Sequence, residues 1–175
     1  MWVRVSTKKL IVSALLVALD VLFVRVLALN TPIMKLGLGF AAVAVGAMAF
    51  GPAWAGLIAA LGDLLGSVLF PTGAYFPPFT LSAALTGVIF GLALYKRPAS
   101  LKSALSAGGL NVIIVSYLIN SGLIAWLSGV SYASTLAVRA VQPLLMLPTQ
   151  CGVIYLLMKS KSVQSVIKNI SPDIK

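Results

Sequence analysis

Residues 37–70 have the sequence GLGFAAVAVGAMAFGPAWAGLIAALGDLLGSVLF and contain one charged side chain, Asp63. The pair Gly51-Pro52 divides this stretch, because proline cannot continue the hydrogen-bond ladder of a preceding helix. Two apolar segments, 37–50 and 52–70, therefore follow one another across a tight turn. Backbone amides in lipid must form hydrogen bonds within their own segment, so both segments are predicted to be membrane helices.

The composition of the whole chain supports the same class of protein. Of its 175 residues, 60% are hydrophobic and 9% are charged, whereas soluble domains contain about 25% charged residues. These values exclude an ordinary soluble domain, a disordered chain and a collagen-like fibre. Four further apolar runs cover residues 6–29, 78–95, 103–127 and 135–158, and none shows the alternation typical of a membrane β-barrel. The prediction is an all-α integral membrane protein: one domain, residues 1–175, with six transmembrane helices, short loops and a basic cytoplasmic tail at 159–175.

The cations predict how this bundle is oriented in the membrane. The chain has 13 Lys and Arg residues, three Asp or Glu residues and no His. With both termini in the cytoplasm, ten cations lie on that side and only Lys35 lies in an outer loop. The ten are Arg4, Lys8, Lys9, Lys96, Arg97, Lys102, Lys159, Lys161, Lys168 and Lys175. Because these cations flank apolar runs and do not form a stripe on a folded face, nucleic-acid binding is not expected.

The residue types also limit the chemistry. Cys151 is the single cysteine and His is missing from the sequence, so an intrachain disulfide and the usual zinc, iron and copper sites are not expected. No phosphate-binding G-x-x-x-x-G-K-[ST] motif is present, and no nucleophile stands beside a base. We therefore expect no metal, no cofactor and no enzymatic activity, and we assign any ATP hydrolysis to partner subunits.

Several polar side chains fall inside the predicted spans, where an ionised group costs about 2.5–3.5 kcal/mol. At about 1.5 Å per residue, Asp63, Asn120 and Gln142 lie roughly 10 Å from the outer ends of three different helices. Arg25 and Arg139 lie roughly 6 Å from the outer ends of theirs. This convergence predicts a pocket that opens outward.

Structural interpretations of the same residues remain open. Asp63 and Arg139 could form an ion pair that only orients two helices, and Asn120 and Gln142 could bond to each other between helices. Asp20 lies deeper, and a structural pairing is favoured for it.

The outer loops add aromatic and cationic groups near the predicted pocket. Residues 70–80, FPTGAYFPPFT, are uncharged and rich in aromatic side chains and proline. Such a loop is predicted to fold over the pocket, and the alternative is a membrane-embedded turn. Lys35 in the first outer loop places a cation near the same opening.

Small residues recur four positions apart on three predicted helices. Ala14 and Ala18 form one such pair, and the glycine pairs are 62/66 and 87/91. Small side chains let helix backbones approach closely, within the chain or toward a partner.

These features together resemble the substrate-binding (S) components of energy-coupling factor (ECF) vitamin importers. The resemblance in span pattern covers nearly the whole chain, and residues 62–83, GDLLGSVLFPTGAYFPPFTLSA, are similar to the folate-specific branch. The resemblance implies a non-catalytic folate-binding subunit in the bacterial plasma membrane. It also implies that this subunit assembles with a transmembrane coupling subunit and two ATPases, with Ala14 and Ala18 at the contact with the coupling subunit.

The residues can be matched to the implied ligand. One carboxylate can accept two parallel hydrogen bonds from the pterin ring, and Asp63 is the best-placed acid. The cations Arg139, Arg25 and Lys35 suit the carboxylates of the glutamate tail. Apolar faces for the ring are available from the aromatic side chains of Tyr75, Phe76, Phe79, Tyr117 and Trp126. The alternatives are an S component for pantothenate, a modified-base precursor or another small vitamin, an intramembrane enzyme, and a helical scaffold that binds only proteins.

Overall fold

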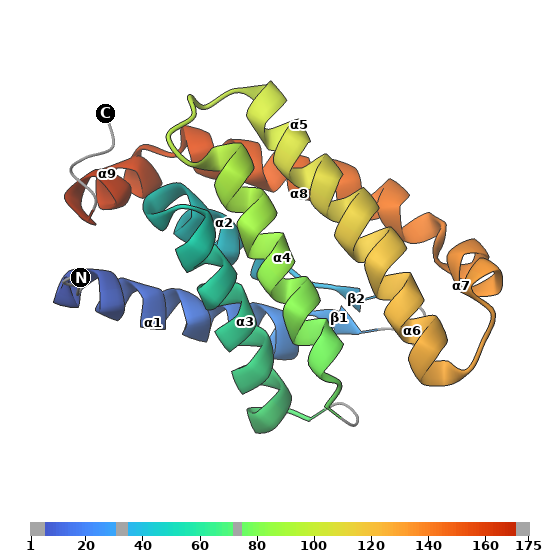
Figure 1. Cartoon of the computed structure of the whole chain (residues 1–175). Helices are drawn as coiled ribbons and strands as arrows, with labels where there is room; N and C mark the ends of the chain where they lie inside the picture. The colour runs from blue at the N-terminus through green and yellow to red at the C-terminus, as the bar shows by residue number, and fades with distance from the viewer. Residues whose placement is uncertain (1–5, 31–34, 72–74, 171–175) are drawn as a thin grey trace.

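The computed structural model of the chain describes residues 6–30, 35–71 and 75–170, which form mainly helices (Figure 1). The first part contains α1 (Thr7–Val21), the π-helical segment η1 (Leu22–Val26), β1 (Leu29–Asn30), β2 (Lys35–Leu36), α2 (Gly39–Phe50), α3 (Pro52–Leu69) and α4 (Pro77–Leu94). The second part contains α5 (Leu101–Leu110), the π-helical segment η2 (Asn111–Ile119), α6 (Asn120–Ser128), α7 (Tyr132–Arg139), α8 (Val141–Lys159) and α9 (Lys161–Ile170). Strands β1 and β2 form a short antiparallel hairpin in which Leu29 is opposite Leu36.

Four helical stretches are long and apolar enough to cross a membrane: Pro52–Leu69, Pro77–Leu94, Leu101–Ser128 and Val141–Lys159. Helix α2 is equally apolar but shorter, with 12 residues. In each of the four stretches, no more than 33% of the residues are buried inside the protein. Large apolar side chains therefore cover the exterior, and Leu144 on α8 is 74% exposed, as expected for a surface that faces lipid.

Glycine and proline determine how α2, α3 and α4 meet. Gly51 has φ = 82°, a backbone conformation that favours glycine, and Pro52 begins α3. On α4, a Cβ atom at Gly87 or Gly91 would collide with the backbone of Ala55 or Pro52 on α3. The two helices therefore pack at close range because these glycines lack side chains.

A core of small and branched side chains lies between the helices. Phe90, Ile154 and Ala104 are fully buried in the larger hydrophobic cluster, while Ile58 belongs to a second cluster with residues of α1 and α2. Together these clusters fix the positions of the helices that surround the polar site.

The structure differs from the sequence-based expectation in three places. The helical part of the first span ends at Val26, and the hairpin begins at Leu29. The sixth span is divided at Ala140 into α7 and α8, and the expected basic tail forms helix α9. In α9, Val163, Ile167 and Ile170 pack against the hydrophobic clusters. Burial of this apolar face stabilises the helix.

The loops gather at two opposite ends of the molecule (Figure 1). The turn at Gly51, the α4–α5 loop and α9 lie at the end drawn at the upper left. The hairpin, the α3–α4 connection and the α6–α7 turn lie at the other end, which we call the hairpin end.

Candidate functional site

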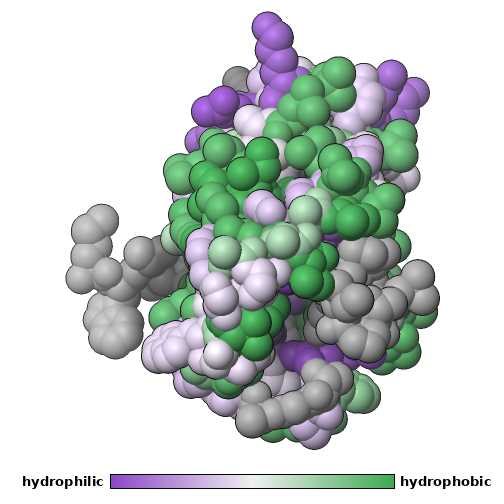
Figure 2. All heavy atoms as spheres, turned by 90° about the vertical axis from the view of Figure 1, so that its right-hand side faces the viewer, coloured by the Kyte–Doolittle hydropathy of each residue, from purple (hydrophilic) through white to green (hydrophobic). Residues whose placement is uncertain are grey.

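A cavity of about 480 Å³ lies at the hairpin end, and the described residues that line it come from both halves of the chain. Figure 2 faces this side of the molecule and shows hydrophobic atoms over most of it, with hydrophilic atoms at its upper end and in a recess in its lower half. We call this space the polar cavity. Its charged and amide-bearing lining residues are Asp20, Arg25, Asp63, Asn111, Asn120, Arg139, Gln142 and Gln150.

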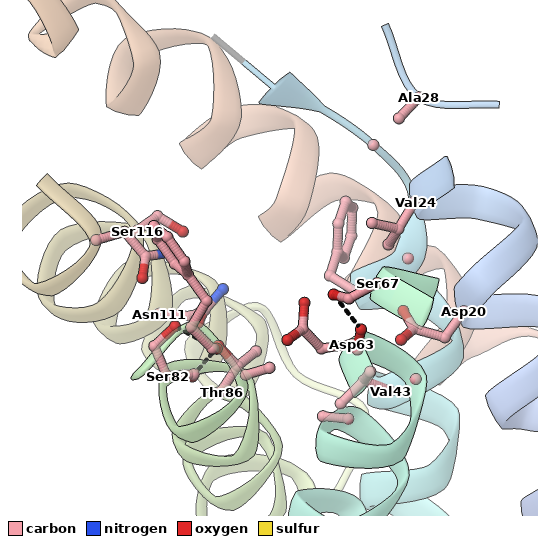
Figure 3. A pocket seen from close by; sticks show the side chains of 18 of the residues that line it. Asp20, Val24, Ala28, Val43, Asp63, Ser67, Ser82, Thr86, Asn111 and Ser116 are labelled. Atoms are coloured by element: carbon pink, nitrogen blue, oxygen red, sulfur yellow. Dashed lines mark hydrogen bonds between the residues drawn. The ribbon is translucent and has the colours of Figure 1, made fainter. Parts of the chain in front are cut away.

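The carboxylate of Asp63 on α3 lies at the centre of one wall (Figure 3). Its Oδ2 accepts a hydrogen bond of 2.7 Å from the Thr80 hydroxyl, whose oxygen lies 2.9 Å from the Tyr75 hydroxyl. Its Oδ1 lies 3.8 Å from Nη2 of Arg25, which donates to Ser67 at 2.8 Å. Ser67 in turn donates to the backbone carbonyl of Asp63 at 2.7 Å. The network joins η1, α3 and α4 around one acid that keeps 23% of its side chain exposed.

Asp20 is the second acid of this wall and lies deeper, with 6% of its surface exposed. Its carboxylate occupies the space that side chains at Gly39 and Gly62 would fill. The next glycine on α3, Gly66, faces the side chain of Arg25 in the same way. Gly62 and Gly66 of α3 therefore leave room for two charged side chains of the first span, Asp20 and Arg25.

The opposite wall is built from α6, α7, α8 and η2. Nη1 of Arg139 donates to the Ser121 hydroxyl at 3.1 Å, and its Nη2 donates to Oε1 of Gln142 at 2.6 Å. Deeper in the cavity, Nδ2 of Asn111 donates to Oε1 of Gln150 at 3.1 Å. These bonds hold one guanidinium and several amides in fixed positions.

Three side chains of this wall keep a buried polar atom without a hydrogen-bond partner among the described residues. The atoms are Oδ1 of Asn111, Oδ1 of Asn120 and Nε of Arg139. A buried polar group without a partner costs about 1–3 kcal/mol, so a ligand that supplied partners here would be stabilised. The wall offers both hydrogen-bond acceptors and a donor.

Aromatic side chains border the cavity beside Asp63. Phe76 and Phe79 line it, with ring centroids 5.7 Å apart in an edge-to-face arrangement. The ring of Trp126 lies 5.4 Å from that of Phe76 and supports it from outside. Tyr75 also lines the cavity. A flat ligand would find apolar ring surface next to a carboxylate.

The structure brings most of the sequence-predicted site residues to this one cavity. Those that line it are Arg25, Asp63, Tyr75, Phe76, Phe79, Asn120, Arg139 and Gln142. Tyr117 is not among the described lining residues, and its hydroxyl donates to the carbonyl of Leu136 at 3.1 Å. The side chain of Lys35 and residues 72–74 of the aromatic loop lie outside the described part of the structure.

Two structural pairings were open from the sequence: an ion pair between Asp63 and Arg139, and a hydrogen bond between Asn120 and Gln142. The structure forms different pairings. Asp63 pairs with Arg25, whereas Arg139 bonds to Ser121 and Gln142. Gln142 therefore accepts from Arg139, and the carbonyl oxygen of Asn120 has no described partner.

Several lining residues were not assigned to the site from the sequence. Asn111 and Gln150 line the cavity but carry no assignment in the sequence analysis, which favours a structural pairing for Asp20. Ser67 and Thr80, which bond to Asp63 or its backbone, carry hydroxyls that give no periodic signal in an apolar sequence. Asn111 belongs to η2 and Arg25 to η1, which agrees with the frequent occurrence of π-helical turns at functional sites.

Comparison with known proteins assigns the family. A sequence model of the family described as "ECF-type riboflavin transporter, S component" matches residues 4–159. The chain belongs to this family of transporter S components. It is thus a multi-pass membrane protein, and its relatives are transport proteins rather than enzymes.

Within this family, the chain is similar to particular relatives and to a solved structure. The chain is 38% identical to the folate transporter FolT of Clostridium novyi (strain NT), over 83% of this chain and 85% of that protein. It is 28% identical to the folate transporter FolT of Leuconostoc mesenteroides subsp. mesenteroides, over 97% and 95% of the two chains. It is also similar to a crystal structure of FolT bound with folic acid, with a TM-score of 0.83 and 30% identity, over 88% of this chain and 94% of that one.

Proposed function

We propose that this chain is the folate-binding S component of an ECF-type importer in the bacterial plasma membrane. It would capture folate from outside and deliver it inward. The observation that carries the proposal is the polar cavity, in which a carboxylate on one wall faces a guanidinium on the other wall, together with two amide oxygens that have no hydrogen-bond partner among the described residues. The FolT relatives and the folic acid-bound FolT structure support the same ligand.

The pterin ring of folate suits the wall that contains Asp63. Its 2-amino and N3–H groups are parallel donors, and one carboxylate can accept both. The carboxylate is partly exposed to the cavity, and Thr80 and Arg25 hold it in place. The rings of Phe76 and Phe79 lie beside it and would cover a face of the pterin.

The glutamate tail of folate requires cations and hydrogen-bond donors. Arg139 on the opposite wall has an Nε without a hydrogen-bond partner among the described residues, and Asn120 and Gln142 lie in the same wall. Lys35 is the other cation that we assign to the tail. Arg25, which the sequence also suggested for the tail, lies 3.8 Å from the carboxylate that would hold the pterin. The volume of the cavity, about 480 Å³, falls in the usual range of about 300–1,000 Å³ for small-molecule sites.

The same proposal includes the membrane topology. The whole chain would form one membrane domain with six spans and both termini in the cytoplasm. The spans would lie at about residues 6–29, 37–50, 52–70, 78–95, 103–127 and 135–158, with α9 in the basic segment 159–175 on the cytoplasmic side. The excess of Lys and Arg near the α4–α5 loop and α9 supports this orientation.

Transport would require a transmembrane coupling subunit and two ATPase subunits. Ala14 and Ala18 on α1 are exposed, as are the neighbouring Ile11 and Leu15 at 63% and 59%. A small-residue stripe on an exposed face allows another helix to approach closely. We assign this face to the coupling subunit.

Folate binding to the purified protein tests the ligand and the site together. Asp63→Asn should weaken binding about 100-fold, because an amide replaces a carboxylate that accepts two charge-assisted hydrogen bonds. Arg139→Ala should also weaken it. Lys102→Gln, which removes a cation far from the cavity, is the control and should bind like the parent. Parental affinity in both cavity variants would show that the polar cavity does not bind folate.

Riboflavin is the second candidate ligand, because the matching family is described by riboflavin transport. Competition between labelled folate and unlabelled riboflavin, pantothenate or other small vitamins distinguishes the candidates. We expect only folates to compete at low concentration. Displacement by riboflavin at a lower concentration than by folate would assign the chain to the riboflavin branch.

A further inference from the structure

A second cavity, of about 750 Å³, lies at the end of the molecule opposite the polar cavity. The α4–α5 loop and α9 form its walls, although they are more than 60 residues apart in sequence (Figure 1). We call it the basic cavity, because four of its lining residues are Lys96, Arg97, Lys161 and Lys168.

No acidic side chain is found among the described residues that line the basic cavity. None of the four cations forms an ion pair with a carboxylate of the described residues, whereas Arg25 and Asp63 of the polar cavity do pair. Asp173, the remaining acid of the sequence, lies outside the described residues. Four cations around one space create a positive potential that attracts an anion.

The two walls of the basic cavity are held in place by local interactions. Nε2 of Gln164 donates to the carbonyl of Met158 at 2.6 Å, which fastens α9 to the end of α8. On the other wall, Lys96 has φ = 54°, a conformation uncommon for a residue with a side chain. Its Nζ lies 5.3 Å from the centroid of the Tyr95 ring. The cations therefore belong to ordered segments of the chain.

The remaining lining of the cavity is largely apolar. Met48, Leu94 and Met158 are buried where α2, α4 and α8 end, and Ile167 of α9 is partly buried. Leu92 and Leu156, two residues before Leu94 and Met158, are 63% and 67% exposed on the exterior. A basic rim thus adjoins lipid-facing apolar surface at the ends of membrane helices, which is the arrangement that binds anionic headgroups.

We propose that the basic cavity binds the phosphate headgroup of an acidic phospholipid, with the acyl chains along the exposed surfaces of α4 and α8. The inference extends beyond folate binding and does not depend on it, because no residue of the polar cavity takes part. A soluble phosphate compound could satisfy the cations but would leave the apolar surface unused. An acidic segment of a partner protein is the other occupant that the test must exclude.

The test is lipid retention by the full-length protein, measured by native mass spectrometry after titration with phosphatidylglycerol or phosphatidylcholine. The test variant is Arg97→Gln with Lys168→Gln, one cation from each wall. The matched control is Lys102→Gln with Lys159→Gln, which removes two cations at the same end that do not line the cavity. Folate binding and thermal unfolding of both variants should equal those of the parent.

We expect the parent to retain phosphatidylglycerol in preference to phosphatidylcholine. The test variant should lose about 25-fold in affinity for phosphatidylglycerol, from about fivefold for each cation near an anionic headgroup, while the control loses less than about threefold. Equal losses in both variants would overturn the proposal, because they would indicate diffuse charge and no site. Displacement of the lipid by an equal concentration of soluble glycerol phosphate would assign the cavity to a soluble anion. Equal retention of both lipids by the parent would leave a partner protein as the occupant and would also overturn the proposal.

Discussion

Arg139 illustrates how one side chain can serve both the folded protein and its ligand. Two of its nitrogens donate to Ser121 and Gln142, while its buried Nε has no described partner. The first two bonds orient the guanidinium, and the third donor remains for a ligand. The residue can therefore be tested with ligands that differ only in the part that it would contact.

We predict that Arg139→Gln weakens folate binding about 10- to 100-fold, because a charge-assisted contact with the glutamate tail is lost. The affinity for the pteroyl amide that lacks glutamate should change less than about threefold, since this ligand offers no tail carboxylate. Isothermal titration calorimetry with both ligands measures the difference. An equal loss for both ligands would indicate that Arg139 acts only by holding Ser121 and Gln142.

At the scale of single residues, the sequence could locate part of the site and not the rest. Counting from helix ends predicted one depth for Asp63, Asn120 and Gln142, and the three side chains line one cavity. Tyr117 is one of the aromatic side chains that the sequence offered to the ligand ring, because ordinary helical spacing puts it on the face of Asn120. It belongs to η2, where i→i+5 hydrogen bonding rotates side chains away from that spacing. A π-helical segment has no sequence signature that would have corrected the face.

The contact between α3 and α4 depends directly on small residues. Gly91 of α4 lies against the backbone of Pro52, so the smallest possible side chain at this position would separate the two helices. Gly152 of α8 has no atom within 4 Å of the position where its Cβ would lie. Gly91 and Gly152 are therefore suited to a comparison: a side chain has no room at the first position and open space at the second.

We predict that Gly91→Ala lowers the free energy of unfolding by about 1–3 kcal/mol, the usual effect of overpacking. Gly152→Ala should leave it unchanged or raise it by up to about 1 kcal/mol, because alanine favours helices more than glycine does. Thermal unfolding of the detergent-solubilised variants measures the difference. Equal midpoints for the two variants would mean that the α3–α4 contact adapts without cost.

Helix starts were accessible from the sequence where proline defines them: α3 begins at Pro52, and α4 begins at Pro77, one residue before the start at residue 78 that the sequence predicted. Helix α9 was not recognised, although Val163, Val166, Ile167 and Ile170 have amphipathic helical spacing. The basic composition of this segment favoured an interpretation as a tail. Its apolar face is stabilised by contacts with the hydrophobic clusters, and such tertiary contacts cannot be read from a local segment.

The polar cavity and the basic cavity lie at opposite ends of the molecule, and this arrangement allows the proposed orientation to be tested. Ser131 lies in the α6–α7 turn at the hairpin end, and Ser100 lies in the α4–α5 loop at the other end. Cys151 is buried and should contribute little background labelling.

We predict that a membrane-impermeant maleimide added to intact cells labels Ser131→Cys and does not label Ser100→Cys. In inverted membrane vesicles the pattern should be reversed, because positive residues keep the α4–α5 loop in the cytoplasm. Labelling of Ser100→Cys in intact cells would contradict the proposed topology.

Binding and transport should also be separable at the scale of the whole molecule. We predict that Ala14→Trp preserves folate binding but lowers folate uptake by the assembled transporter about tenfold or more, which corresponds to about 1.4 kcal/mol of association. Leu144→Trp is the control, because Leu144 is an exposed apolar residue on α8, and its uptake should equal that of the parent. Loss of binding together with uptake in Ala14→Trp would indicate misfolding and would not support a partner surface.

The hydroxyl of Thr80 determines the direction of a chain of hydrogen bonds that ends at the cavity mouth. A hydroxyl has one hydrogen to donate, and Thr80 uses it on the carboxylate of Asp63. The bond between Thr80 and Tyr75 must therefore be donated by the phenol. The negative charge of Asp63 thus sets the polarity of both hydroxyls, and Tyr75 can only accept from an incoming molecule. A ligand group that docks on this phenol must bring its own hydrogen, so the Tyr75 hydroxyl discriminates against groups that are acceptors alone.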